Sequence, residues 1–138
     1  MVKKILFMGK EQLLFNLYKE AIDERNSFQS ENQYELMKGE DGPESNPFIQ
    51  FIHYGTHYDL PYLEAKLRDY PELKALIFIK PTEHHVIGKI NQLMLDYPLA
   101  VLGITELPIQ PARLWTFLSN VESKTLHFEW EDGDWDEF

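Results

Sequence analysis

Short apolar runs recur along the chain and are separated by segments of mixed polarity. Residues 4–9 are largely apolar and end at a glycine, and a second run occupies 48–54. Two further runs follow at 75–79 and 99–104. Apolar runs of this length, bounded by turn residues, are typical of strands that are covered on both faces of a sheet. The pattern therefore predicts four buried strands.

The segments between these runs have apolar residues at intervals of three and four, which places them on one face of a helix. This spacing predicts helices over residues 11–25, 58–70, 86–95 and 111–121. In the first helix Leu13, Leu14, Leu17 and Tyr18 are expected to pack on the core. Asp59 is the N-cap candidate of the second helix, because its side-chain oxygen can accept a hydrogen bond from a free backbone N–H.

Two stretches leave the number of strands open. Residues 26–47 are rich in Gly, Pro, Asn and Ser, and 34–37 interrupt them with a short segment that favours a strand. If it is a strand, the turn residues after it favour a hairpin that spans 34–54. Near the C-terminus, residues 125–130 alternate apolar and polar side chains, which predicts a last strand at the sheet edge.

Strands and helices alternate in this order, which predicts the α/β class in a single domain of three layers. The sheet is expected to be mainly parallel and five-stranded, with helices on both faces, and the hairpin at 34–54 would add an extra strand. Sheets of this kind bind ligands outside the carboxyl ends of their strands. Site residues are therefore expected in the loops that follow the strands.

The composition changes this picture mainly by exclusion. Thirteen Lys and Arg against twenty-three Asp and Glu give a net charge of -10, which argues against free nucleic acid or an anionic membrane as the main partner. The absence of cysteine excludes disulfides, thiolate nucleophiles and thiolate metal sites. The first apolar run is too short for a signal peptide or a membrane span, so we expect a cytoplasmic protein.

Residues 3–128 resemble the CheY-like receiver domain of response regulators in the order and length of their elements. The similarity is highest over 75–105, where a buried strand, a loop, a helix and a Tyr-Pro break lead into a strand ending in Gly103-Ile104-Thr105. Thr105 matches the hydroxyl residue that receivers place after their fourth strand. The resemblance implies a flavodoxin-type fold and a role in signalling.

The phosphorylation residues of receivers are not matched. Receivers have an acidic pair after strand one, where this chain has Gly9-Lys10-Glu11. They have a phospho-accepting aspartate at the end of strand three, where it has Ile79-Lys80, and a lysine after strand five, where it has acidic residues. Without these carboxylates neither a magnesium site nor a phosphate acceptor is expected. The sequence therefore favours a degenerate, phosphorylation-independent and non-enzymatic module. We expect it to use no cofactor and to act through a protein partner, with a homodimer left open.

Histidines gather at or just after two of the predicted strands. They are His53, His57, His84 and His85, and Glu83 and Glu106 also lie on strand-end loops. Imidazole and carboxylate groups that converge form a site for a borderline metal ion such as zinc. The other interpretation is that histidines occur here because loops are polar. The alternative function is an enzyme or sensor that binds a metal ion or a small anion in the strand-end cleft.

Residues 131–138 are acidic and aromatic, which divides the chain into a domain over 1–130 and a C-terminal tail. Like charges at this density repel one another and are typical of a solvated segment. Aromatic residues within it favour a binding role, because aromatic side chains anchor interfaces. The candidate partner-binding residues are Trp135, Phe138, Asp134 and Asp136. The other interpretation is that Trp130 and Trp135 pack on the core of the domain.

Overall fold

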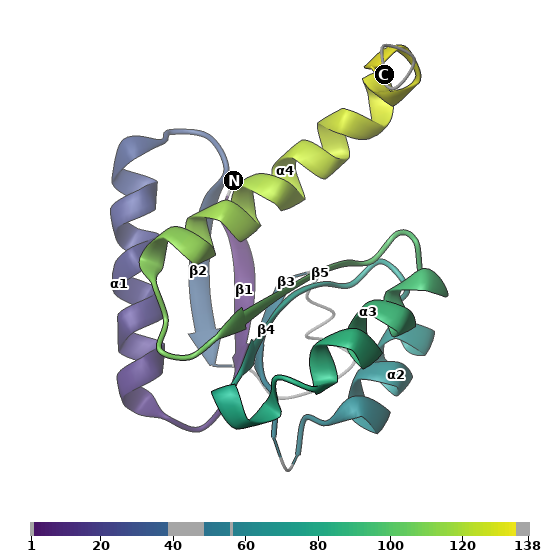
Figure 1. Cartoon of the computed structure of the whole chain (residues 1–138). Coiled ribbons are helices and arrows are strands. Elements are labelled where there is room, and N and C mark those ends of the chain that lie inside the picture. The colour runs from purple at the N-terminus through teal and green to yellow at the C-terminus, as the bar shows by residue number, and fades with distance from the viewer. Residues whose placement is uncertain (1, 39–48, 56, 135–138) are drawn as a thin grey trace.

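The computed structural model describes residues 2–38, 49–55 and 57–134, with side chains as far as residue 122. Strands and helices alternate along most of this length (Figure 1). The strands are β1 (Val2–Met8), β2 (Gln33–Lys38), β3 (Ile49–His53), β4 (Lys74–Ile79) and β5 (Val101–Glu106). The helices are α1 (Gln12–Phe28), α2 (Leu60–Asp69), α3 (Val86–Leu95) and α4 (Pro111–Asp134). None of the described helices is long and apolar enough to cross a membrane.

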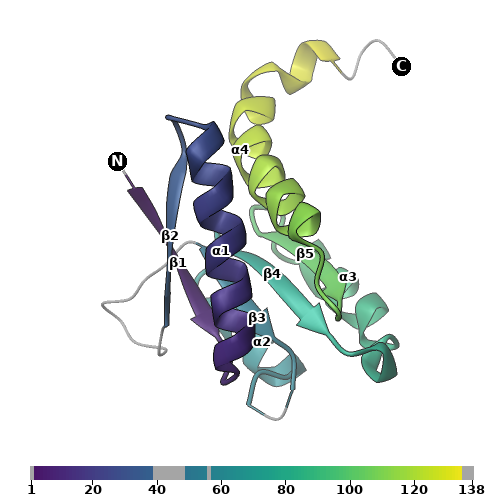
Figure 2. The ribbon, with the colours of Figure 1, turned by 90° about the vertical axis from the view of Figure 1, so that its left-hand side faces the viewer.

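The sheet has five strands in the order β2-β1-β3-β4-β5, and every neighbouring pair is parallel. Helices α1 and α4 cover one face of it, and α2 and α3 cover the other (Figure 1). Figure 2 shows α1 and α4 side by side in front of the strands. The predicted α/β fold, with a parallel five-stranded sheet between two helical layers, is therefore confirmed.

The uninterrupted apolar runs follow from burial on both faces of the sheet. In β1, Ile5 and Phe7 pack toward α1 and α4, whereas Leu6 and Met8 pack toward α2 and α3. All four side chains are at most 6% exposed. Successive side chains of a strand point to opposite faces, so a strand between two helical layers needs apolar residues at every position.

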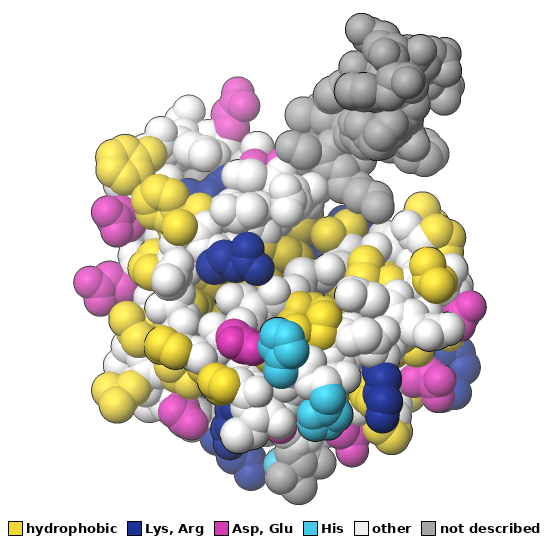
Figure 3. Space-filling view, viewed as in Figure 1, with side chains coloured by type: hydrophobic (Ala, Val, Ile, Leu, Met, Phe, Trp, Pro, Cys, Tyr) yellow, Lys and Arg dark blue, Asp and Glu magenta, His cyan; other side chains and the backbone are white. Residues whose placement is uncertain are grey.

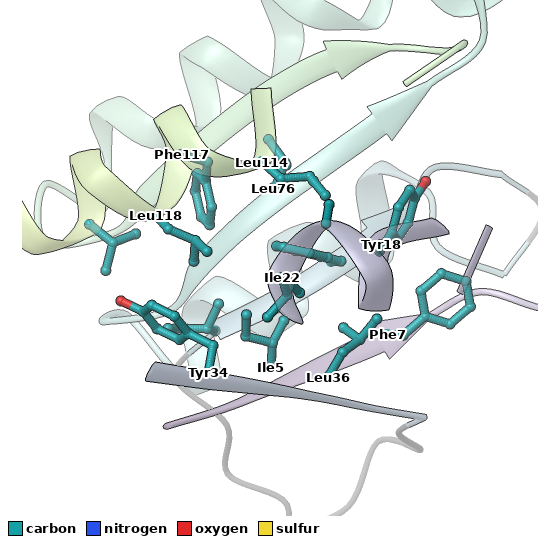
Figure 4. Close-up of a cluster of buried hydrophobic side chains, with 14 of the residues drawn as sticks. Ile5, Phe7, Tyr18, Ile22, Tyr34, Leu36, Leu76, Leu114, Phe117 and Leu118 are labelled. Atoms are coloured by element: carbon teal, nitrogen blue, oxygen red, sulfur yellow. The ribbon is translucent and has the colours of Figure 1, made fainter. Parts of the chain in front are cut away.

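Helix α1 is rotated relative to the predicted orientation. Tyr18 is buried as predicted and Leu14 is half-buried, but Leu13 and Leu17 are exposed rather than packed on the core. The face of α1 that meets the sheet is formed by Tyr18, Ile22 and neighbouring positions (Figure 4). Because a helix has about 3.6 residues per turn, Leu13 and Leu17 lie on the side of α1 when Tyr18 and Ile22 face the sheet.

The segment predicted at 34–37 is a strand, but the hairpin over 34–54 is wrong. β2 pairs with β1 in parallel, from Val2 opposite Gln33 to Phe7 opposite Lys38. Helix α1 returns the chain to the end of the sheet where β1 begins, so the strand that follows it runs in the same direction as β1. The turn proposed over 39–43 lies outside the described residues.

The edge strand predicted over 125–130 is also wrong, because α4 continues through these residues to Asp134. No proline or glycine occurs between Pro111 and Gly133 to stop the helix. Helix propagation adds one hydrogen bond for each residue that it fixes, so extending an existing helix is favoured over starting a strand. Figure 1 shows the last turns of α4 leaving the sheet and extending away from it. The five strands of the sheet are complete without it, because β2 takes the place that the prediction gave to 125–130.

Candidate functional site

The carboxyl ends of the parallel strands lie along one edge of the sheet, where open α/β sheets bind ligands. At this edge β1 leads into Gly9 and β3 ends at His53. Next to them β4 leads into Lys80 and β5 ends at Glu106. The candidate site consists of the side chains at these four strand ends and those that pack against them.

His53 is packed among aromatic rings. Its imidazole is stacked on Phe78, with centroids 4.7 Å apart and planes 10° apart, and on Tyr18, with values of 5.5 Å and 15°. Phe7 meets the same ring edge-on at 5.4 Å. Gly9 packs against these rings with no space for a side chain. A Cβ atom at position 9 would lie 3.1 Å from His53 Cδ2 and 3.0 Å from Phe7 Cζ. The first turn after β1 therefore packs directly on the rings.

Tyr18 and His53 are also joined by a hydrogen bond within this cluster. The Tyr18 hydroxyl and His53 Nε2 share a hydrogen bond of 2.8 Å. Burial lowers the pKa of His53 from 6.5 to about 4, so the imidazole is neutral at neutral pH. Burial, and after it the negative charge of Glu11, raises the pKa of the Tyr18 hydroxyl, which therefore keeps its proton. A nitrogen that already bonds to a hydroxyl inside a ring stack is poorly placed to bind a metal ion.

The structure does not gather the four predicted histidines. His57, His84 and His85 are exposed, whereas His53 lies in the ring cluster. His84 Nδ1 contacts a carboxylate oxygen of Glu106, the acidic residue at the end of β5. Among the side chains of residues 2–38, 49–55 and 57–122, no group of three or more His, Asp or Glu is placed to hold a metal ion. The arrangement of the described residues does not support the metal hypothesis.

A shallow hollow of about 330 Å³ lies beside the His84–Glu106 pair. The Arg113 guanidinium forms part of its lining and donates a hydrogen bond of 3.1 Å to the carbonyl of Ile104. Thr105 also lines it and is 6% exposed. Glu83 does not enter the hollow; its carboxylate accepts a hydrogen bond from the backbone N–H of Lys80 across a short 3-10 turn.

The strand count changes which residues stand at the positions of the receiver's phosphorylation residues. Because β2 is the second strand, β3 is the third and ends at His53. The expected match of the acceptor position with Ile79-Lys80 is therefore corrected, since these residues follow the fourth strand. Thr105 likewise belongs to the fifth strand rather than the fourth. The positions after the later strands move by one strand because the sequence pattern did not count 34–37 as a parallel strand, whereas the position after β1 stays at Gly9-Lys10-Glu11.

Comparison with known proteins identifies structures with a similar fold but no relative by sequence. No family model and no curated protein matches the chain. Among solved structures, NtrX from Brucella abortus in complex with ADP is similar, with a TM-score of 0.64 and 17% identity over 96% of this chain. A CheY-like receiver domain protein from Methanospirillum hungatei JF-1 has a TM-score of 0.58 and 14% identity, and the match covers 95% of this chain and 99% of that one. A structure described as adenylate cyclase from Rhodopirellula baltica has a TM-score of 0.55 and 10% identity, with 99% and 98% covered.

These similarities define the class of the protein by its fold, which is a receiver-like α/β domain. The predicted resemblance to CheY-like receivers is confirmed at the level of the fold. The match covers only 29% of the NtrX chain, so this chain has the length of one part of that larger protein. Fold similarity alone does not transfer an activity, because activity depends on the residues of the site.

Proposed function

We propose that this chain is a non-enzymatic signalling module that acts through a protein partner and without phosphorylation. The observation that carries the proposal is the position of His53. This residue ends the third strand, where receivers have their acceptor aspartate, and its ring stacks on both Tyr18 and Phe78, which also stack on each other. An aromatic cluster at this strand end supports a module that works without an acceptor aspartate.

The neighbouring strand ends support the same conclusion. Phosphoryl transfer to a carboxylate needs the nucleophile itself and further carboxylates that hold Mg²⁺. After β1 the chain has Gly9 and Lys10, and Glu11 is the one acid before α1 begins. At the end of β5 the carboxylate of Glu106 is paired with His84. The described strand ends thus offer single carboxylates rather than a cluster.

The proposal is tested by incubating the full chain with acetyl phosphate and Mg²⁺ and measuring its intact mass. We expect no phosphorylated product under conditions that fully modify an active receiver domain run in parallel. A stoichiometric acyl phosphate on any Asp or Glu would overturn the proposal. His53→Asp is an informative second variant, because it places a carboxylate at the end of the third strand. We expect it to stay unmodified as well, since no acidic pair follows β1.

The partner contact is proposed to include the acidic C-terminal residues. Their aromatic side chains would anchor a basic, partly apolar groove, while their carboxylates would accelerate encounter and make binding sensitive to salt. The residues concerned are Asp134, Trp135, Asp136 and Phe138. The proposal of a tail beyond the domain over 1–130 rests on the same charge argument.

A further inference from the structure

Three of the most exposed large apolar side chains of the described chain lie on α1. Leu13 is 77% exposed, Leu17 47% and Phe28 72%. Glu20 and Glu24 are exposed between them. We call these five residues the α1 flank. Figure 3 shows hydrophobic side chains spread down the side of the molecule that α1 forms, with acidic groups beside them.

The α1 flank is one continuous surface. Its residues are spaced by four, three, four and four positions, so they follow a single line along the helix. From Leu13 to Phe28 this line is about 22 Å long, at about 1.5 Å per residue. It faces the side where α4 lies, because the Phe28 ring meets Trp115 of α4 edge-on at 6.2 Å. On α4 the residues three positions before and four positions after Trp115 are Ala112 and Ser119, which are small and exposed.

The packing beneath holds this surface in place. The Trp115 indole N–H donates a hydrogen bond of 3.0 Å to the carbonyl of Ala21. One turn further along, Arg25 is 3% exposed and its guanidinium contacts both carboxylate oxygens of Glu122 at 3.1 Å. Because α1 and α4 are joined at two levels, a ligand of the flank does not have to order the helices first, which reduces the entropic cost of binding.

Charge selects the occupant of the flank. Glu20 and Glu24 place two carboxylates in its middle, and the nearest lysine on α1, Lys19, is paired with Asp23 at 3.0 Å. A second copy of the chain has a net charge of -10 and would oppose acids to acids, and the chain's own acidic C-terminus has the same disadvantage. A partner that presents Lys or Arg between apolar residues is complementary to the flank.

We infer that the α1 flank binds a basic amphipathic helix of a partner protein. Apolar residues of that helix cover Leu13, Leu17 and Phe28, and its basic residues reach Glu20 and Glu24. A helix is the matching shape because apolar side chains at intervals of three and four form an equally straight line. The inference rests on the proposed function, since it names the kind of partner through which the module acts.

The test uses a helical peptide of leucine and lysine, about five turns long, added to the full ¹⁵N-labelled chain. We expect saturable shifts of amides in α1 and α4. The double variants Leu13→Ser with Leu17→Ser, and Glu20→Lys with Glu24→Lys, should each weaken binding at least tenfold. Leu95→Ser with Leu99→Ser is the matched control, because these leucines are 76% and 57% exposed elsewhere. It should bind the peptide like the unchanged chain.

Because the altered positions are exposed, we expect every variant to have the melting temperature of the unchanged chain. Equal melting temperatures would show that each variant is folded. Absence of binding, or equal weakening by the flank and control pairs, overturns the inference. A dimer of the unchanged chain that the Leu13 and Leu17 changes dissociate would assign the flank to a second copy and also overturn it. An acyl phosphate would overturn the proposed function whether or not the peptide binds. Absence of peptide binding without an acyl phosphate would overturn the inference about the α1 flank but would not contradict the proposed function.

Discussion

Phe78 connects three elements through one ring. It is 1% exposed, stacks on His53 and Tyr18 with centroids 4.7 and 4.8 Å away, and meets Phe51 edge-on. We predict that Phe78→Ala lowers the free energy of unfolding by about 3–5 kcal/mol, because it leaves a cavity between β4 and α1. Urea denaturation measures the change. The control Leu99→Ala, at a site 57% exposed, should cost less than about 0.5 kcal/mol. A loss below about 1 kcal/mol for Phe78→Ala would contradict this packing.

His53 makes the stability of the domain depend on pH. Burial lowers its pKa from 6.5 to about 4, so between these values the unfolded chain binds a proton that the folded chain does not. Its contribution to stability is therefore complete above about pH 6.5 and is lost as the pH falls toward about 4. Between about pH 7 and pH 5 we predict a loss of about 2 kcal/mol from this residue.

Two variants separate this effect from that of other titrating groups. His53→Gln retains a hydrogen-bonding group beside Tyr18 but does not titrate, so its unfolding free energy should change less over the same pH interval. His57→Gln is the matched control, because it makes the same change at an exposed histidine outside the ring cluster. An NMR titration of the imidazole reports the pKa directly. A His53 value near 6.5 would show that the ring is solvated.

At the scale of elements, a buried ion pair joins α1, β2 and α4. The Arg25 guanidinium on α1 contacts the Glu122 carboxylate on α4 at 3.1 Å, and the two side chains are 3% and 17% exposed. The Tyr34 hydroxyl on β2 donates a hydrogen bond of 2.6 Å to the same carboxylate. Burial, together with this bond to Glu122, raises the pKa of Tyr34. Glu122 is therefore the common acceptor that links the edge strand to both helices.

We predict that Glu122→Ala lowers the free energy of unfolding by about 3 kcal/mol, because it leaves the buried Arg25 charge without its partner. The value is at the lower end for buried pairs, since Glu122 keeps some contact with water. Asp23→Ala is the control, because it breaks an ion pair with Lys19 whose side chains are 54% and 60% exposed. It should cost less than about 0.5 kcal/mol. Equal losses for the two variants would show that the Arg25 pair is effectively solvated.

At the scale of the whole molecule, charge accumulates toward the C-terminus. Deleting residues 132–138 removes four carboxylates and changes the net charge from -10 to -6. We predict that the melting temperature stays the same or rises slightly, because self-repulsion decreases and the described core lies before this segment. Calorimetry of both lengths measures this. A domain that unfolds on truncation would show that Trp135 or Phe138 belongs to the core, and the proposed tail contact would then fail.

The sequence by itself determined the elements whose signals are local. The apolar runs located β1, β3, β4 and β5, and the helix over 86–95 has the predicted bounds. Asp59 caps α2 as predicted, since its carboxylate accepts the N–H of Tyr62 at 3.1 Å. These features depend on residues that are close in sequence, so spacing and side-chain type are sufficient to predict them.

Only the tertiary structure decided how these elements combine. The direction of β2 depends on its pairing with β1, and the exposure of Leu13 and Leu17 depends on how α1 is rotated against the sheet. The ring cluster joins Tyr18 to His53 across 35 positions of sequence. No local pattern contains that contact, because stacking and burial arise only when helix and strands pack together. The candidate histidines were therefore found from sequence, whereas the aromatic surroundings that set the pKa of His53 came from the fold.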